Sequence, residues 1–508
     1  MKTLQSAVSA HAKARPDHPA LICGDRAVSY AELHRRGWMT AHALAAAGVG
    51  EGSRVAHFAR DSLMYYDLLL GCAILGAVLV PADWRLSASE VDHVLRDSGA
   101  ALLFHDTSTM DRMAEVESTV PELREIILLD PDGFAHWQAA HTDKITVPQT
   151  GRETPVLQLY TSGTSGAPKG VVLAQRTFFA LGELLTGHGV DWIDWHPGDR
   201  SLVALPGSRI GGIWWATQGL VAGVTNVILP VWSGERAVRE IHEHRITTAC
   251  VVPAMLERLL DEPRADIASL RKVVYGGGSL DETLFARISS IVDVELVQVY
   301  GPTESGIPAV CLPPAGHRRS RLAAAGRPFP GVGLRIVDGA GVEVPAGVVG
   351  EVRVSSPAGM VEYWNAPEKT ADTLVDGWIS TGDAGFLDED GYLSVLGPIS
   401  DMITVGGEHV YPAEVEDAIR RHPDVADAAV VGAPDPARGE RVYAFIVARN
   451  GNPPSGPELT AFLRGSLAGF KIPTAFEVVD AVPRTPVGRI LRRIARDRLW
   501  SEVVRKAG

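Results

Sequence analysis

A loop of small hydroxyl residues and glycines is the segment of this sequence best suited to chemistry. It reads Tyr160-Thr-Ser-Gly-Thr-Ser-Gly-Ala-Pro-Lys-Gly170 and follows the apolar segment Val156–Leu159. Its backbone N–H groups and hydroxyls are donors and Lys169 adds a point charge, so the loop can wrap phosphate oxygens. It differs from the P-loop pattern GxxxxGK[ST], because Pro168 occupies the place of the second required glycine. The alternative is a hairpin turn of small residues.

Further short motifs follow along the chain, rich in glycine or carrying a single carboxylate. They are Gly276-Gly-Gly-Ser-Leu280, Tyr300-Gly-Pro-Thr-Glu304, Gly350-Glu351, Ser380-Thr-Gly-Asp383 and Gly406-Gly-Glu-His-Val-Tyr-Pro-Ala-Glu-Val-Glu416. Together with the loop, and with Ser29-Tyr-Ala-Glu-Leu33 near the start, they resemble the ordered motifs of the adenylate-forming superfamily. That superfamily contains acyl-CoA synthetases, the adenylation domains of peptide synthetases, and luciferases. The resemblance spans nearly the whole chain.

The resemblance implies that ATP and an acid condense to an acyl-adenylate and pyrophosphate. Because the attacking and leaving oxygens are both anionic, positioning and charge neutralisation matter more than a protein nucleophile. It assigns Mg²⁺, which prefers oxygen ligands, to Thr164 and Glu304. Tyr300 would face adenine, and Asp383 would accept from the ribose hydroxyls. The implied ATP-binding residues are Thr161, Ser162, Gly163, Thr164, Ser165, Gly166, Lys169, Gly277, Gly278, Ser279, Tyr300, Gly301, Thr303, Glu304 and Asp383.

The C-terminal part departs from the family pattern at three positions. Arg489 ends Pro483-Arg-Thr-Pro-Val-Gly-Arg489, where the family has a catalytic lysine that bridges the acid and the α-phosphate. Arginine keeps the charge, but its planar fork is wider and less flexible. Within Gly397-Pro-Ile-Ser-Asp401, Pro398 replaces an arginine and Ser400 a charged hinge residue. We expect catalysis to depend on Lys169, Thr164, Glu304 and Arg489; the alternative is an impaired enzyme.

The segment Pro206-Gly-Ser-Arg-Ile-Gly-Gly212 departs from the family in the substrate region. Arg209 stands where histidine is common, and it could pair with an anionic group of the substrate. The alternative is a salt-bridged structural arginine. Tryptophans nearby in sequence would shorten a tunnel and favour a compact or aromatic acid, unless they only pack the core: Trp192, Trp195, Trp214, Trp215 and Trp232. The predicted substrate residues are Arg209, Gly212, Trp215, Gly276 and Ser305.

A second half-reaction is indicated near the C-terminus. Gly406 and Gly407 would leave room for a pantetheine arm. In Ala468-Gly-Phe-Lys-Ile-Pro473, the resemblance implies that Phe470 stacks on the CoA nucleotide and Lys471 meets phosphate. The alternative is a turn that closes a helix. The segment favours CoA over a carrier protein.

Three functions are therefore compared. The leading hypothesis is ATP-dependent activation of a small, aromatic acid followed by transfer to CoA. The alternative within the superfamily is adenylation of an unusual acid such as nitrite, with transfer to an aryl amine and without CoA. The third is a nucleotide-binding sensor or scaffold without catalysis, which the intact Lys169, Thr303, Glu304 and Asp383 argue against.

The elements that position these motifs follow an α/β pattern. Capping boxes at Ser29 and Ser87 and short apolar segments predict parallel sheets covered by helices. The run Leu68–Ala82 reads as a buried helix running into a strand. Around Gly331 the pattern changes to hairpins of a small β subdomain, and after about Gly397 to a small α+β domain. In that domain we expect helices after Pro412 and over Glu458–Leu467, and strands over Ala428–Val431, Val442–Val447 and Ala475–Val479. The predicted domains are residues 1–399, which bind AMP, and a mobile lid of residues 400–508.

Length and composition set the class. With 508 residues, 46% hydrophobic and 21% charged, the chain is a globular protein of two or more domains. A net charge of −13 without a sustained basic run argues against nucleic acid or a membrane surface as partner. Four distant cysteines, no secretory leader and no run long enough to span a bilayer predict a cytoplasmic protein. A homodimer is compatible with the sequence.

Overall fold

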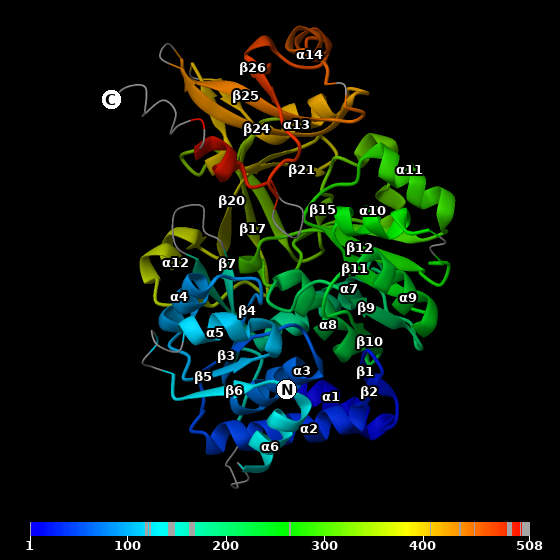
Figure 1. Ribbon diagram of the computed structural model, residues 1–508, viewed down its shortest axis with the longest axis vertical. Helices are drawn as coiled ribbons and strands as arrows, with labels where there is room; N and C mark the ends of the chain where they lie inside the picture. The colour runs from blue at the N-terminus through cyan, green and yellow to red at the C-terminus, as the bar shows by residue number, and fades with distance from the viewer. Residues whose placement is uncertain are drawn as a thin grey trace. The chain divides into compact units, whose positions relative to one another are not determined.

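The chain folds into two compact units, which Figure 1 traces from blue to red. Unit 1 contains Met1–Leu334 and Arg353–Thr381, and unit 2 contains Arg335–Val352 and Gly382–Gly508. The computed structural model describes residues 2–116, 120, 123–140, 148–161, 168–263, 266–406, 408–435, 438–451, 453–484, 490–497 and 499. The mixed α/β class predicted from the sequence is confirmed, whereas a domain boundary near Ser400 stays a prediction.

The larger sheet of unit 1 has nine strands, and its six central strands are parallel. Helices α9, α10 and α11 pack on it through a shared apolar core that includes Ile241, Leu256 and Ile288. The strands in sheet order are β15 (Arg327–Pro328), β14 (Val310–Leu312), β13 (Glu295–Tyr300), β12 (Lys272–Gly276), β11 (Thr248–Val251), β9 (Arg200–Val203), β10 (Thr225–Ile228), β1 (Pro19–Cys23) and β2 (Arg26–Ser29). The helices of this half are α1 (Leu4–Ala14), α7 (Ala180–His188), α8 (Ile210–Ala222), α9 (Gly234–His244), α10 (Pro253–Asp261) and α11 (Glu282–Ile291).

The second sheet of unit 1 has seven strands, with antiparallel strands at one edge. Helices α4 and α5 cover it through a core that includes Phe58, Val94 and Met113. In sheet order the strands are β18 (Glu362–Tyr363), β8 (Lys169–Ala174), β7 (Pro155–Thr161), β4 (Val78–Ala82), β3 (Arg54–Phe58), β5 (Leu102–His105) and β6 (Glu125–Leu128). The helices around it are α2 (Tyr30–Ala46), α3 (Leu63–Leu75), α4 (Ala88–Ser98), α5 (Met110–Val116), α6 (Pro131–Ala140) and α12 (Pro367–Thr373).

Local sequence explains several of these elements. Helix α3 is apolar on every side and almost wholly buried, and it ends where Gly76 takes a left-handed conformation with φ +70°. The chain then enters the fully buried strand β4, which confirms the prediction for Leu68–Ala82. At Ser87 a complete capping box opens α4, as predicted. At Ser29 only the serine half is present, because its side chain accepts from Glu32 N–H without a reciprocal bond.

Unit 2 contains a sheet with strands in the order β23 (Glu408–Val410), β22 (Ile403–Val405), β25 (Gly439–Ala448) and β24 (Val425–Asp435), with β26 (Ala475–Val478) on β25. Helices α13 (Pro412–Arg420) and α14 (Gly456–Leu463) complete its core. Another sheet, also of five strands, has β16 (Gly333–Val337), β17 (Gly350–Ser355), β20 (Trp378–Leu387) and β19 (Leu374–Val375) in that order, and β21 (Leu393–Pro398) on β20; its strands include residues of both units. Helix α14 is shorter than the predicted Glu458–Leu467, because the chain turns near Gly465.

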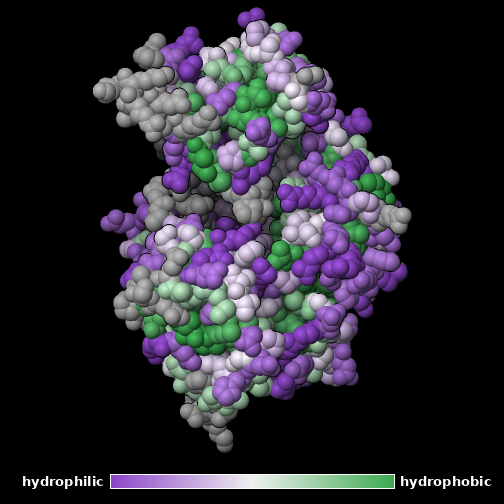
Figure 2. All heavy atoms as spheres, in the orientation of Figure 1, coloured by the Kyte–Doolittle hydropathy of each residue, from purple (hydrophilic) through white to green (hydrophobic). Residues whose placement is uncertain are grey.

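Hydrophilic side chains cover most of the face of unit 1 seen in Figure 2, interrupted by smaller hydrophobic areas. In the part of the chain that the structure describes, no helix has the length and hydropathy needed to cross a bilayer.

Candidate active site

The predicted phosphate loop joins two antiparallel strands. Thr161 at the end of β7 pairs with Lys169 at the start of β8, and Tyr160 pairs with Gly170. The strands are close-packed here, because a Cβ on Gly170 would lie 2.6 Å from Nε2 of Gln158. The strand pair that carries the loop is therefore closely packed, and Lys169 lies at the end of this pair. The predicted residues between the strands, Ser162, Gly163, Thr164, Ser165 and Gly166, lie outside the described residues.

Lys169 and Glu304 meet at one tyrosine that the sequence analysis did not identify. The Tyr363 hydroxyl donates to Glu304 Oε1 over 2.5 Å. The Lys169 ammonium lies 4.6 Å from the centroid of the Tyr363 ring, a cation–π contact. Strand β18 places Tyr363 beside β8, with Tyr363 opposite Val171. Two predicted residues far apart in sequence are thus brought together by a third.

The adenine-side motifs lie at the ends of two neighbouring parallel strands. Strand β12 ends at Gly276, which pairs with Val299 next to the last residue of β13, Tyr300. A Cβ on Gly276 would lie 2.8 Å from the Val299 carbonyl oxygen, so the strands need glycine here. The carboxyl ends of parallel strands share one edge of the sheet, where α/β folds bind ligands. Beyond β12 the exposed residues that follow are Gly277, Gly278 and Ser279.

The turn that carries Glu304 is held firmly. Thr303–Ser305 form one 3₁₀ turn after Gly301, where a Cβ would lie 2.9 Å from Ala309 N. Ser305 is fully buried, and its hydroxyl donates to the carbonyls of Pro302 and Ile307 over 2.7 and 2.6 Å. Ser305, predicted to meet substrate, therefore supports the turn.

Arg209 lies at the N-terminus of α8. Its guanidinium is half-exposed and makes one long contact, of 3.9 Å, with Asp83 Oδ2. Arg85 already binds both oxygens of that carboxylate, over 2.7 and 2.5 Å. A Cβ on Gly212 would lie 2.2 Å from the Pro206 carbonyl oxygen, so glycine is required for α8 to begin so close to this loop. Arg209 is thus held loosely and can reach an anion.

The loop before Arg209 is held by Tyr65 of α3 and by Asp61, which precedes that helix. Gly207 N–H donates to Asp61 Oδ2 over 2.8 Å, and the Gly207 carbonyl accepts from Tyr65 over 2.9 Å. Burial raises the pKa of Asp61 to about 7, against the lowering effect of the Gly207 hydrogen bond. Burial likewise lowers the pKa of His57, which lies against Tyr65 with ring centroids 4.9 Å apart, to about 4.

The predicted tryptophans pack mainly into the core. Trp214 and Trp215 are 1% and 2% exposed, and the Trp215 indole N–H donates to the Leu202 carbonyl over 3.2 Å. Trp195 lies against Trp215, with ring centroids 4.8 Å apart, and Trp192 against Phe329 at 5.7 Å.

In unit 2, Asp383 lies on β20 opposite Pro398 of β21. The proline that replaces the family's arginine is therefore the register partner of the predicted ribose-binding residue. Asp383 is half-buried. Because proline has no backbone N–H, the strand pair lacks one possible donor at this point.

The predicted acceptor residues partly converge. Gly406 and Phe470 line one pocket of about 440 Å³ with Val405, Gly469 and Arg438. Arg438 was not identified from the sequence; its carbonyl accepts from Gly406 N–H over 2.9 Å. Lys471 instead binds both oxygens of Glu414 over 2.7 and 2.8 Å. Gly407 lies outside the described residues.

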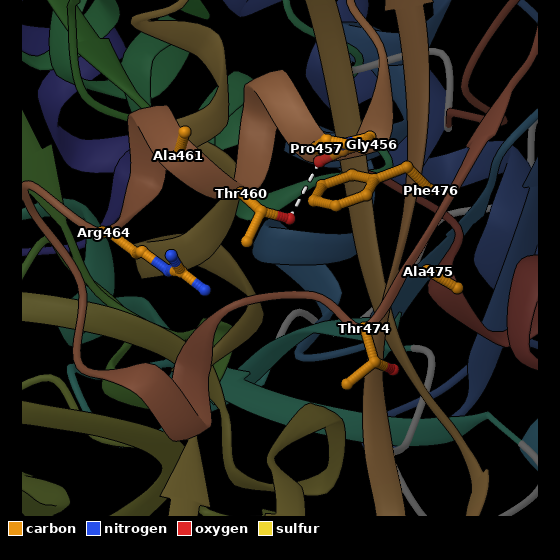
Figure 3. A pocket seen from close by; sticks show the side chains of 8 residues that line it. All are labelled: Gly456, Pro457, Thr460, Ala461, Arg464, Thr474, Ala475 and Phe476. Carbon is orange, nitrogen blue, oxygen red and sulfur yellow. Dashed lines mark hydrogen bonds between the residues drawn. The ribbon is translucent and has the colours of Figure 1, made fainter.

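Figure 3 shows a second pocket of unit 2, between α14 and β26, of about 470 Å³. Thr460 lies on the α14 side of the pocket, where its hydroxyl donates to the Gly456 carbonyl over 2.8 Å. Arg464 and Phe476 also line the pocket. None of the predicted nucleotide, substrate or acceptor residues that the structure describes lines it.

Arg489 lies outside the described residues, but the chain on either side of it is anchored. Before it, Arg484 binds both oxygens of Asp427, each over 2.7 Å. After it, Arg492 binds Glu416 Oε2 over 2.6 Å and Asp401 Oδ2 over 3.2 Å. Glu416 is 2% exposed, so its ion pair with Arg492 is buried, whereas the Arg484–Asp427 pair is partly exposed.

Comparison with known proteins identifies the class. Residues 8–364 match the family model described as AMP-binding enzyme, and residues 414–489 match the AMP-binding enzyme C-terminal domain. The chain belongs to the AMP-binding enzyme family and is an AMP-forming, acid-activating ligase. The predicted superfamily membership and enzymatic class are confirmed, and the scaffold hypothesis gains no support.

Individual relatives share nearly the whole chain. The fatty acid–[acyl-carrier-protein] ligase ScoC of Streptomyces coeruleorubidus is 50% identical, covering 100% of this chain and 98% of that protein. The indoleacetate–CoA ligase of Aromatoleum aromaticum is 35% identical over 95% of each chain. The solved O-succinylbenzoate coenzyme A synthetase of Bacillus subtilis, in complex with AMP, is 30% identical with a TM-score of 0.85, covering 97% of this chain and 98% of that chain. The roles of single residues, Mg²⁺, CoA, a homodimer and a cytoplasmic location stay predictions.

Proposed function

We propose that the protein condenses a carboxylic acid with ATP and passes the acyl group to the thiol of a pantetheine arm. The observation that carries this proposal is the Lys169–Tyr363–Glu304 cluster. No carboxylate pairs with Lys169 among the described residues, and Glu304 uses only Oε1 for Tyr363. A cation and a carboxylate are thus free for a nucleotide and its counterion.

In the first step a carboxylate oxygen attacks the α-phosphorus of ATP, and the bond to the bridging oxygen of pyrophosphate breaks. Lys169 neutralises charge on the phosphates, which lowers the cost of bringing two anions together. Mg²⁺ is usually bound by one or two carboxylates together with substrate phosphates. Glu304, which uses one carboxylate oxygen for Tyr363, fits this need with its other oxygen. Glu304 and Thr164 would hold the ion, and it would supply further neutralisation of phosphate charge.

In the second step the thiol sulfur attacks the acyl carbon, AMP leaves, and the thiol proton passes to solvent. We propose a carrier protein as the preferred acceptor. The Glu414 carboxylate neutralises Lys471, the cation expected to meet a CoA phosphate. A carrier protein presents the same pantetheine arm without the nucleotide. The 50% identity to an acyl-carrier-protein ligase supports this choice.

For the acid we propose a compact molecule, aromatic or short-chain. The loosely held Arg209 supports this choice, because an arginine suits an acid with a second anionic group. The related ligases named above act, by their names, on fatty acids, indoleacetate and O-succinylbenzoate. None of these names mentions nitrite or an amine, and we do not propose the nitrite alternative.

The test is pyrophosphate release from Mg-ATP with short fatty acids, aromatic acids and dicarboxylates, followed by thioester formation with CoA or a phosphopantetheinylated carrier protein. We expect release with one acid class and thioester formed faster on the carrier protein. Equal or faster transfer to CoA would overturn the acceptor. No release with any acid would overturn the proposed function.

A further inference from the structure

We propose that Tyr363 is a positioning residue for the nucleotide: its hydroxyl orients the Glu304 carboxylate, and its ring holds the Lys169 ammonium. The inference rests on the proposed adenylation. Tyr363 is 4% exposed and belongs to a short strand far in sequence from both partners. It touches the two charged groups rather than the reacting atoms.

The hydroxyl of Tyr363 has a defined direction. It donates to Glu304 Oε1 over 2.5 Å, and Thr373 at the end of α12 is its other hydrogen-bonding partner. With one oxygen bound in this way, the carboxylate cannot rotate freely. Among the described residues no hydrogen bond or ion pair engages its second oxygen, Oε2, which can therefore bind a cation.

The backbone on either side of Tyr363 is fixed to the base of the phosphate loop. Val361 N–H donates to the Val172 carbonyl and Trp364 N–H to the Gly170 carbonyl, each over 2.8 Å. The Trp364 ring is covered by Arg54, whose guanidinium carbon lies 3.2 Å from the ring centroid. The Tyr363 ring therefore keeps its place beneath Lys169.

The same returning segment also clamps the turn that carries Glu304. Met360 N–H donates to the Glu304 carbonyl over 2.7 Å, and the Ser356 hydroxyl donates to the Ser305 carbonyl over 2.7 Å. Gly306, with φ +70°, would place a Cβ 2.0 Å from the Ala358 carbonyl oxygen. Backbone and side chain of Glu304 are thus fixed by one segment, residues 356–363. Such a shell around a metal-binding carboxylate tunes its affinity for the metal.

The test measures ATP binding by titration calorimetry, with and without MgCl₂ and without any acid. In Tyr363→Phe the ring remains beneath Lys169 and only the hydroxyl is lost. We expect the gain in ATP affinity that Mg²⁺ provides to fall by roughly ten- to a hundredfold. ATP affinity without Mg²⁺ should stay unchanged. In Tyr363→Leu the ring is lost as well, and ATP affinity without Mg²⁺ should also fall.

The matched control is Tyr443→Phe in unit 2, which removes a tyrosine hydroxyl that donates to Glu477 Oε2 over 3.0 Å. It should leave both affinities unchanged. In a Glu304→Gln background, Tyr363→Phe should cause no further loss, since the hydroxyl acts through Glu304. Parental Mg²⁺ dependence in a folded Tyr363→Phe protein, or a full additional loss in the double variant, would overturn the proposal.

Thermal unfolding shows whether each variant is folded. If Tyr363→Phe unfolds, Thr373→Val removes the other partner of the same hydroxyl and should weaken the Mg²⁺-dependent gain in the same direction; no change would overturn the proposal. Because no acid is present, this result is independent of the adenylation test. Failure to release pyrophosphate would overturn the proposed function while leaving the role of Tyr363 measurable.

Discussion

Charged side chains have different partners in the Lys169–Tyr363–Glu304 cluster of unit 1 and in unit 2. In unit 1, Lys169 lies over an aromatic ring and Glu304 accepts from a neutral hydroxyl. In unit 2, Arg492 binds Glu416 and Asp401, and Lys471 binds Glu414. The first pair of charges has neutral neighbours, and the second set is neutralised internally.

We propose that charges with neutral neighbours serve a ligand, whereas charges in internal ion pairs serve the fold. A neutral partner can orient a charged group without cancelling its charge, so the group still attracts a phosphate or a cation. An ion pair cancels the charge. When the pair is buried, loss of either partner leaves an uncompensated buried charge and destabilises the fold. The comparison predicts that changes in unit 1 affect chemistry, and that changes in the buried pairs of unit 2 affect stability.

The largest effect on stability is expected from Arg492→Ala. The substitution leaves Glu416, which is 2% exposed, as an uncompensated buried charge. We expect a loss of about 3–5 kcal/mol in the free energy of unfolding, measured with urea. The control is Arg484→Ala, whose partner Asp427 is 25% exposed; it should cost about 1 kcal/mol or less. Equal losses in the two variants would contradict the comparison.

Glu304→Gln should lower activity and leave stability unchanged. The amide oxygen can still accept from Tyr363, so the unfolding temperature should stay near that of the parent. The loss of one negative charge at the proposed cation site should lower pyrophosphate release by roughly 10²- to 10³-fold. The matched control is Glu477→Gln, which changes a tyrosine-bound glutamate in unit 2. A variant that keeps more than a tenth of parental release would refute the role of Glu304.

Glu414→Gln tests whether neutralisation of Lys471 restricts the acceptor. Freed from its partner, Lys471 should attract a phosphate, and the KM for CoA should fall roughly two- to fivefold, in line with the strength of an exposed ion pair. The rate with a carrier protein should not change. The control is Asp417→Asn on the same helix, where Asp417 pairs with Arg420. An unchanged or higher KM for CoA argues against this role.

The smallest effect is expected from Asp61→Asn, and it depends on pH. The pKa of Asp61 is raised to about 7, whereas in the unfolded chain it is about 4. Between these values the folded state holds the proton that the unfolded state has released, so the free energy of unfolding falls as pH rises through this window. Asparagine can still accept from Gly207 and does not ionise. At pH 8 we expect the variant to be more stable by roughly 1 kcal/mol, and at pH 4 equal to the parent.

Urea unfolding at both pH values measures this effect. The variant should show a smaller pH slope between pH 4 and 7 than the parent. If both proteins show the same slope, Asp61 is already ionised in the folded state at neutral pH, and it accepts from Gly207 N–H as a carboxylate anion.

Much of the fold could be predicted because it depends on local pattern. The buried run Leu68–Ala82 became α3 and β4, and the serine–glutamate spacing at Ser87 marked the start of α4. The motif Tyr300-Gly-Pro-Thr-Glu304 was also recognisable, because the residue that ends the strand and the glycine that follows it are consecutive in the sequence. The predicted helix over Glu458–Leu467 was too long, because apolar periodicity continues past the point where the chain turns.

The partners of the site residues could not be predicted in the same way. Tyr363 follows Glu304 by 59 positions and reads as an ordinary strand residue. Only the antiparallel pairing of β18 with β8 brings its ring to Lys169. Likewise, Lys471 looked free to meet a phosphate, and the packing of α13 beside it supplied Glu414.

The sequence by itself determined which residues stand at the strand ends and which chemical groups they carry, because motif spacing and apolar period act over a few residues. The tertiary structure alone decided which of those charges stay available and which are neutralised. That outcome depends on distances between side chains far apart in sequence, and the electrostatic value of a charge changes with its neighbours and burial.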